Sequence, residues 1–167
     1  MCEQSAKRAR AKALALLTGR DYTEAGLRSK LAQKGFDQAA CDDAVSYVKR
    51  YGYLDDERYA DRYIELHRDS ASRRRIAAEL KEKKGVPSDV LEAALGRAGE
   101  WDEKPLIRKL AEKKFAGRPV SDPVLLQKVT AALVRRGFNY RDIREVLDGL
   151  EEEGNGECPE RGEGIFY

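Results

Sequence analysis

The sequence has 167 residues and a formal net charge of +2, with 37% charged and 8% aromatic residues. With only five prolines it is not a proline-rich or collagen-like chain, and long helices are possible. No apolar run approaches the roughly 20 residues of a membrane helix, and the first residues lack the apolar stretch of a secretory signal, so we expect a cytoplasmic protein without a membrane partner.

Three helices are expected at the start of the chain. Apolar residues recur at helical spacing over about residues 8–19. Thr23 is placed to cap a second helix, and Gly35 supplies the left-handed residue that ends it. The third helix is predicted over about 38–50, with Cys41 on its buried side.

Three further helices are expected in the middle of the chain. The acidic run 55–57 falls in the first turn of a helix, where it complements the positive end of the helix dipole. A single helix is predicted over 73–84, and Pro87 can stand at the start of the next one.

The last part of the body repeats this plan. A helix is expected over about 101–116, with its regular part beginning near Pro105. Ser121 or Asp122 caps the following helix, and the final helix spans about 140–150. Carboxylates dominate the end of the chain, where we expect little fixed structure.

A glycine motif recurs about every fifty residues and relates the three parts to one another. Its copies are Leu31-Ala-Gln-Lys-Gly35-Phe36, Leu80-Lys-Glu-Lys-Lys-Gly85-Val86 and Leu133-Val-Arg-Arg-Gly137-Phe138. No segment alternates apolar and polar residues long enough for a strand. We therefore predict a monomeric all-α fold of three tandem three-helix repeats, packed into an elongated, curved array. The repeats are assigned to residues 1–54, 55–99 and 100–150, and residues 151–167 to an acidic flexible tail.

Signatures of enzymes are weak in this sequence. His67 is its single histidine, and it contains no phosphate-binding glycine loop. The carboxylates of Asp55, Asp56, Glu57 and Asp61 leave one alternative open, a nuclease that depends on Mg²⁺, although a helical first turn is itself a structural reason for them. We predict that the protein is not an enzyme and has no catalytic residue, metal or cofactor.

Basic residues recur on the helix that precedes each motif glycine. Arg74 and Lys81 fall on the opposite side of that helix from the apolar Ile76 and Leu80. Stacked repeats would align such cations into a stripe suited to a phosphate backbone or an acidic protein groove, although solvated helix faces with compensating glutamates explain much of the pattern too. The residues predicted to face the partner are Arg28, Lys34, Arg73, Arg74, Arg75, Lys81, Lys84, Arg135 and Arg136.

Tyrosines crowd the stretch 47–63, where the third and fourth helices must meet. Aromatic rings among basic residues can stack on unpaired bases. The helical spacing of Tyr59 and Tyr63 favours packing at the junction of two repeats instead.

Two segments of the second repeat closely resemble the signature of the RecX family of bacterial regulatory proteins. They are GYLDDERYADRYI at 52–64 and SRRRIAAELKEKKGV at 72–86. The likeness extends through YTEAGLRSKL at 22–31 and LVRRGF at 133–138, and covers about residues 8–150. The sequence departs from the family in having serine and alanine at 70–72, where members often have a glycine.

The resemblance implies a modulator of the RecA recombinase that lies in the helical groove of the RecA filament on single-stranded DNA. Members of this family restrain the ATP hydrolysis, strand exchange and co-protease activity of RecA, and so affect recombination, DNA repair and the SOS response. The expected partners are therefore the RecA filament and the single-stranded DNA within it. A regulator that binds DNA alone through helix-turn-helix-like units is the alternative.

Overall fold

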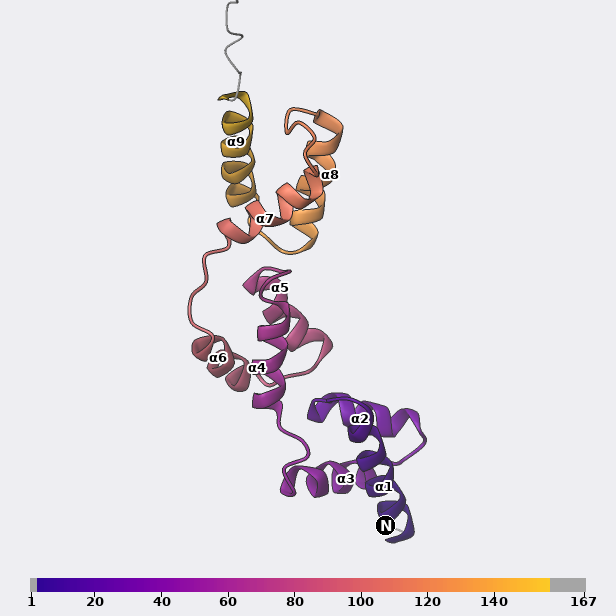
Figure 1. Ribbon diagram of the computed structural model, residues 1–167. Coiled ribbons are helices and arrows are strands. Elements are labelled where there is room, and N and C mark those ends of the chain that lie inside the picture. Colours follow the sequence, from indigo (N-terminus) through magenta and orange to yellow (C-terminus); the bar gives the residue numbers. More distant parts are fainter. Residues whose placement is uncertain (1–2, 157–167) are drawn as a thin grey trace, which may run out of the picture. The chain divides into compact units, whose positions relative to one another are not determined.

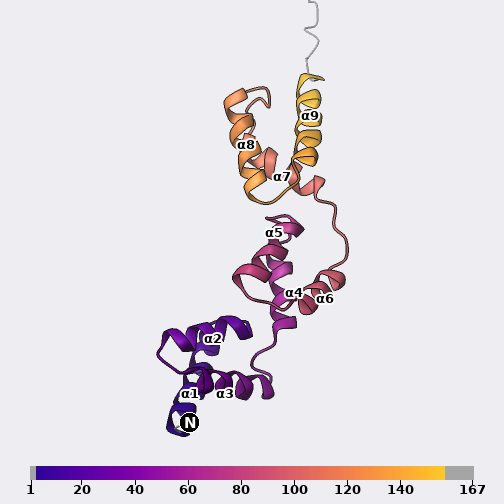
Figure 2. The same ribbon diagram turned by 180° about the vertical axis from the view of Figure 1, so that it is seen from behind.

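The structure is a computed structural model that describes residues 3–156. Within this range every regular element is a helix (Figure 1), which confirms the predicted all-α fold. The helices group into two units. The first unit joins residues 3–68 with 73–100, and the second joins 69–72 with 101–156. The first predicted repeat and all of the second except residues 69–72 lie in the first unit, and the helices of the third repeat lie in the second (Figures 1 and 2).

The first repeat consists of α1 (Glu3–Gly19), α2 (Glu24–Gln33) and α3 (Gln38–Arg50). α1 begins earlier than the predicted start near residue 8, because Ala6 and Ala9 continue its buried side toward the N-terminus. The core of the repeat is built from small and branched apolar side chains. These are Ala9, Ala13, Leu27, Leu31, Ala40, Cys41, Ala44, Val45, Val48 and Leu54.

Short polar side chains begin α2 and α3. The Oγ1 atom of Thr23 accepts a hydrogen bond of 3.0 Å from the backbone N–H of Gly26, which confirms Thr23 as the cap of α2. Asp37, which was not predicted, caps α3 by accepting a 2.8 Å bond from the N–H of Ala40. Cys41 is buried as predicted, and this burial raises the pKa of its thiol.

The second repeat contains α4 (Asp56–His67), α5 (Arg73–Ala78) and α6 (Ser88–Arg97). Asp55 is the cap of α4 rather than a first-turn residue, since its side chain accepts a 3.0 Å bond from the N–H of Arg58. Within this repeat, α4 packs mainly against α6. The buried side chains of the repeat are Ala60, Ile64, Ile76, Leu80, Val86, Leu91 and Ala94.

The helix predicted over 73–84 changes character halfway. It is α-helical only as far as Ala78, and residues Glu79–Lys83 form a π-helical turn. The cause is visible in the glycine motif, where five positions separate Leu80 from Gly85 but four separate the leucine from the glycine in the other two copies. The wider turn accommodates the extra residue. Leu80 and Val86 therefore both remain buried, and the N–H of Val86 still donates a 3.0 Å bond to the carbonyl of Leu80.

The third repeat consists of α7 (Lys104–Phe115), α8 (Pro123–Arg135) and α9 (Tyr140–Gly156). Asp122, one of the two predicted candidates, caps α8 by accepting bonds of 3.0 and 3.2 Å from the first backbone N–H groups of that helix. The core of the repeat contains Ile107, Ala111, Phe115, Leu125, Val129, Leu133, Phe138, Ile143, Leu147 and Leu150.

The last helix is longer than predicted. α9 extends to Gly156 instead of ending near Leu150, so residues 151–156 of the predicted flexible tail are helical. Glu153 forms an exposed ion pair with Arg108, which joins this added part of α9 to α7. Residues 157–167 of the predicted tail lie outside the described residues.

Contacts between the backbone of one repeat and side chains of the other join the first repeat to the second. Gly85 has a φ angle of +67°, and a Cβ atom added to it would lie 2.6 Å from the Cβ of Ala25 in α2. Beside this contact, the buried hydroxyl of Thr23 donates a hydrogen bond to the carbonyl of Lys84. The carboxylate of Asp56 accepts a 2.8 Å bond from the N–H of Glu24. Contacts of this kind require the two repeats to sit at one fixed distance.

Gly85→Ala is expected to destabilise the protein more than Gly35→Ala. Both substitutions place an L side chain in the left-handed region, which costs about 1–2 kcal/mol. At Gly85 the new methyl group would also collide with Ala25, which adds about 1–3 kcal/mol, whereas nothing lies within 4 Å of the same position at Gly35. Urea unfolding followed by circular dichroism measures both free energies of unfolding.

The double variant Ala25→Gly/Gly85→Ala supplies the control, because it removes the Cβ atom of Ala25 and leaves the backbone strain at position 85. It should be less destabilised than the sum of the two single variants. Equal costs at Gly35 and Gly85, or additive costs in the double variant, would show that the two repeats are not held at this distance.

Candidate interface for a polyanionic partner

Two of the nine cations predicted to face a partner are engaged in ion pairs within their own repeat. The Nε atom of Arg28 lies 2.7 Å from a carboxylate oxygen of Asp42, which joins α2 to α3. Arg75 lies 2.8 Å from the carboxylate of Glu79, one helical turn further on. Both pairs neutralise charge that the sequence pattern assigned to a binding surface.

Two others contact uncharged groups. Arg73 donates a 3.3 Å hydrogen bond to the backbone carbonyl of Leu95 in α6. The Nζ atom of Lys84 lies 5.7 Å from the centre of the Tyr63 ring, a cation–π contact. A cation–π contact supplies no opposite charge, so Lys84 can still attract an anion.

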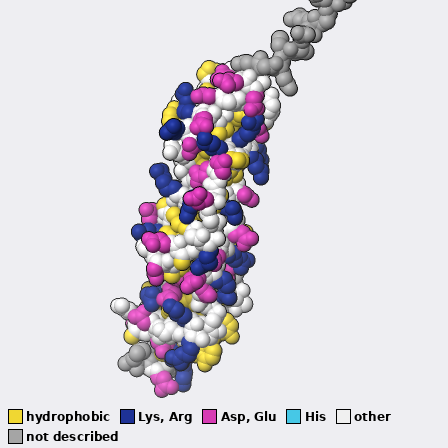
Figure 3. All heavy atoms as spheres, turned by 90° about the vertical axis from the view of Figure 1, so that its left-hand side faces the viewer, with side chains coloured by type: hydrophobic (Ala, Val, Ile, Leu, Met, Phe, Trp, Pro, Cys, Tyr) yellow, Lys and Arg dark blue, Asp and Glu magenta, His cyan; other side chains and the backbone are white. Residues whose placement is uncertain are grey.

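The remaining five predicted cations are Lys34, Arg74, Lys81, Arg135 and Arg136, and none of them has an ion-pair partner among the described residues. Four are exposed and Arg136 is half-buried. On the face seen in Figure 3, Lys and Arg side chains are interspersed with Asp and Glu, so no region of one sign covers that face. The alignment of cations from all three repeats into one stripe stays a prediction.

The structure also contains a groove that sequence reasoning missed. It lies in the first unit, between the loop that joins α1 to α2, α2 itself and the π-helical turn, and its volume is about 490 Å³. We call it the junction groove. Its basic and aromatic lining consists of Arg20, Tyr22, Lys30, Tyr59, Lys83 and Lys84. A helical repeat pattern gives little signal for such a groove, because Arg20 and Tyr22 lie in a loop and Tyr59 comes from a different repeat.

Aromatic rings form a ladder along α4 beside this groove. The rings of Tyr59 and Tyr63 are stacked with centres 6.2 Å apart, and the ring of His67 stacks on Tyr63 at 4.0 Å. The hydroxyl of Tyr63 donates a 2.7 Å hydrogen bond to Glu79. Burial and this bond raise the pKa of Tyr63 to about 12. Of the clustered tyrosines, Tyr59 lies at the repeat junction, where it borders the groove, whereas Tyr63 bonds within its own repeat and Tyr51 and Tyr53 are exposed.

Glu79 holds the ladder and the π-helical turn together. Besides the bond from Tyr63, its carboxylate accepts a 3.2 Å hydrogen bond from the Nζ atom of Lys83 and forms the ion pair with Arg75. These donors lower the pKa of Glu79 to about 2, with the Tyr63 hydrogen bond as the largest cause. Glu79 is therefore ionised, and Tyr63 neutral, at any pH near neutrality.

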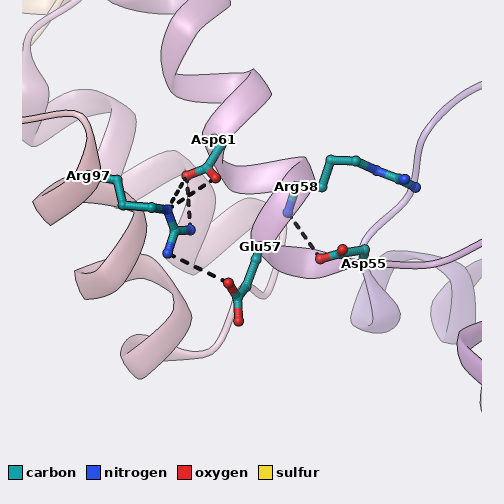
Figure 4. A network of polar contacts seen from close by, with 5 residues as sticks. All are labelled: Asp55, Glu57, Arg58, Asp61 and Arg97. Atoms are coloured by element: carbon teal, nitrogen blue, oxygen red, sulfur yellow. Dashed lines mark hydrogen bonds and ion pairs between the residues drawn. The ribbon is translucent and has the colours of Figure 1, made fainter. Parts of the chain in front are cut away.

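The acidic cluster considered for Mg²⁺ binding has protein partners instead (Figure 4). The guanidinium of Arg97 lies 3.0 Å from Asp61 and 3.6 Å from Glu57, which joins α6 to α4. Asp55 caps α4, and Asp56 accepts the bond from α2 while burial raises its pKa. In the described part of the chain, no three His, Cys, Asp or Glu side chains are grouped so that they could hold a metal ion.

Family models describe all three repeats. The first, second and third three-helix domains of RecX match residues 9–47, 55–95 and 102–147. Regulatory protein RecX of Trichlorobacter lovleyi is 38% identical over 141 residues, which cover 81% of this chain and 91% of that protein. The protein of the same name from Clostridium perfringens is 36% identical over 131 residues, which cover 77% of this chain and 61% of that protein.

The chain belongs to the RecX family. The crystal structure of RecX from Lactobacillus salivarius has the same fold, with a TM-score of 0.69 at 20% identity over 89% of this chain and 98% of that one. The junction groove lies between the first and second RecX domains. None of the helices within residues 3–156 is long and apolar enough to cross a membrane.

Glu79→Gln is expected to destabilise this RecX protein at neutral pH and much less in acid. A carboxyl group whose pKa is about 2 when folded and about 4.5 when unfolded stabilises the fold above pH 4.5. This contribution declines as the pH falls from 4.5 through 2. The melting temperatures of wild type and variant should therefore differ by a few degrees at neutral pH, since a hydrogen bond to a charged group contributes about 1.5–3 kcal/mol, and converge near pH 2.

Glu92→Gln serves as the control, because Glu92 is exposed and none of the described ion pairs includes it. Its effect should be small at both pH values. A difference between wild type and Glu79→Gln that stays constant from neutral to acid pH would contradict the role given to the Glu79 carboxylate.

Proposed function

We propose that this protein is a non-catalytic regulator that binds the RecA filament on single-stranded DNA. Through this binding it restrains the ATP hydrolysis, strand exchange and co-protease activity of RecA in the cytoplasm, and so affects recombination and DNA repair. Membership of a family whose members are named regulatory proteins supports the proposal. The observation that carries it is the set of exposed cations without an internal partner.

Exposed, unpaired cations suit a polyanionic partner because they give up no interaction within the protein when they bind. Arg74 and Lys81 meet this condition in the second repeat, Lys34 in the first and Arg135 in the third. Each contact with a phosphate releases condensed counterions, so the affinity for nucleic acid falls as the salt concentration rises. Cations that already have carboxylate partners, such as Arg28, contribute less.

Tandem repeats suit a partner that is itself repetitive. A filament presents equivalent sites at regular intervals, and repeats joined in one chain bind at a high effective concentration once the first is bound. A ligand that binds one state of the filament more tightly stabilises that state. Binding across neighbouring subunits would therefore slow the subunit rearrangements that accompany ATP turnover, without any chemistry on the part of the regulator.

The double variant Arg74→Gln/Lys81→Gln is expected to inhibit RecA less strongly. The concentration needed to halve ATP hydrolysis by RecA on single-stranded DNA should rise about two- to thirtyfold, because each of the two exposed charge contacts contributes about 0.2–1 kcal/mol. If both residues contact phosphates, the slope of log affinity against log salt should fall by about 1.4. A coupled ATPase assay at several salt concentrations measures both quantities.

A matched control is Lys109→Gln/Lys113→Gln, which removes two exposed cations of α7 that are not among the nine. This variant should inhibit RecA almost as well as wild type. Unchanged inhibition by Arg74→Gln/Lys81→Gln would reject the placement of the interface on the second repeat. Tight, sequence-dependent binding to duplex DNA without RecA would favour the helix-turn-helix-like alternative over the proposed function.

A further inference from the structure

We propose that the junction groove binds unpaired nucleotides of a single strand, with Tyr59 as the ring on which a base stacks. This inference rests on the proposed function and assigns part of it to one surface of this chain. The nine cations predicted from the sequence do not define that surface, because Lys84 alone among them lines the groove.

Tyr59 is half-buried at the junction of the two repeats, so part of its side chain remains open to a ligand. Its ring lines the junction groove and two adjoining cavities of about 320 and 430 Å³, which all meet around the loop between α1 and α2. Its hydroxyl makes no hydrogen bond with the described residues. The remaining rings of the ladder are fixed, since Tyr63 is bonded to Glu79 and covered by His67 and Lys84. The ladder thus presents Tyr59 from a rigid support.

The charges around this ring favour an anion. Four cations line the groove, Arg20, Lys30, Lys83 and Lys84, against two carboxylates. Lys83 is already paired with Glu79 at 3.2 Å and Asp21 with Arg62 at 2.8 Å. Among the described residues, three cations without an ion pair therefore remain in the groove against one carboxylate. The guanidinium of Arg20 lies 4.5 Å from the centre of the Tyr22 ring, which places a cation and an aromatic face side by side.

The combination of rings and cations points to single strands rather than to duplexes or acidic peptides. A phosphate backbone alone requires cations but gives no role to Tyr59, whereas an unpaired base offers a flat face that stacks on its ring. In a duplex these faces are covered by neighbouring base pairs. The groove volume, about 490 Å³, falls in the range of about 300–1,000 Å³ that is usual for sites of single small molecules, so it suits a base with its sugar and phosphate and not a double helix.

The groove is formed before any ligand arrives. Its two walls come from different repeats, and the contact of Gly85 with Ala25 and the hydrogen bond from Thr23 to Lys84 set the distance between them. A strand that binds there therefore gains cations from both repeats without first ordering the protein.

Fluorescence anisotropy with a short labelled oligothymidylate, at low salt and without RecA, tests this inference. Tyr59→Leu should weaken binding at least about fivefold, the loss expected when one stacking ring is removed. Tyr59→Phe keeps the ring and should bind nearly as well as wild type. Arg20→Gln/Lys30→Gln should lower the salt slope by about 1.4. Tyr140→Leu, which changes an exposed tyrosine of the second unit, is the matched control and should bind like wild type.

Three outcomes would overturn the inference. The first is that Tyr59→Leu binds the oligothymidylate as tightly as the wild type. The second is that an unlabelled duplex competes as well as an unlabelled single strand, and the third is that the wild type does not bind at all. If any of them occurs while the wild type still inhibits ATP hydrolysis by RecA, the proposed function stands and only this site is rejected. If Tyr59→Leu alters the circular dichroism spectrum, the Tyr59→Phe and Arg20→Gln/Lys30→Gln variants decide the question instead.

Discussion

The close approach of Gly85 to Ala25 determines how the first two repeats are arranged. At this point a left-handed backbone and a missing side chain are needed together, because any larger residue would both strain the chain and push α2 away. The hydrogen bonds from Thr23 to Lys84 and from Glu24 to Asp56 can form only at that separation. The ion pairs between the repeats, such as Arg62 with Asp21, are exposed and contribute comparatively little.

Much of the fold follows from local sequence signals. Thr23, Gly35 and Asp122 act where short polar residues and glycine are expected at helix ends, and the buried side chains of α3 and α8 follow helical spacing. Local signals fail where the outcome depends on contacts distant in the sequence. The start of α1 at Glu3 depends on packing against α3, and the continuation of α9 to Gly156 is associated with the ion pair of Glu153 with Arg108.

The candidate interface was harder to predict than the fold. A helical wheel shows which side of a helix a cation occupies, but it cannot show whether a carboxylate from another helix reaches it, as Asp42 reaches Arg28. Nor can it show that Arg20, from a loop, and Tyr59, from the next repeat, line one groove. Charge patterns identify the class of partner. Only the tertiary structure sorts these cations into those that stabilise the chain and those that remain available.

The π-helical turn of the second repeat has a consequence for how members of this architecture can be compared. The turn takes up the one inserted residue, so Val86 is buried after it just as Phe138 is in the third copy, and the insertion changes only residues Glu79–Lys83. Positions outside the turn remain comparable: the carbonyls of Lys84 and Arg136, each just before a motif glycine, accept hydrogen bonds from Thr23 and from the backbone N–H of Ser72. An alignment of the three copies therefore needs a one-residue gap in the first and third motifs, placed opposite the π-helical turn of the second.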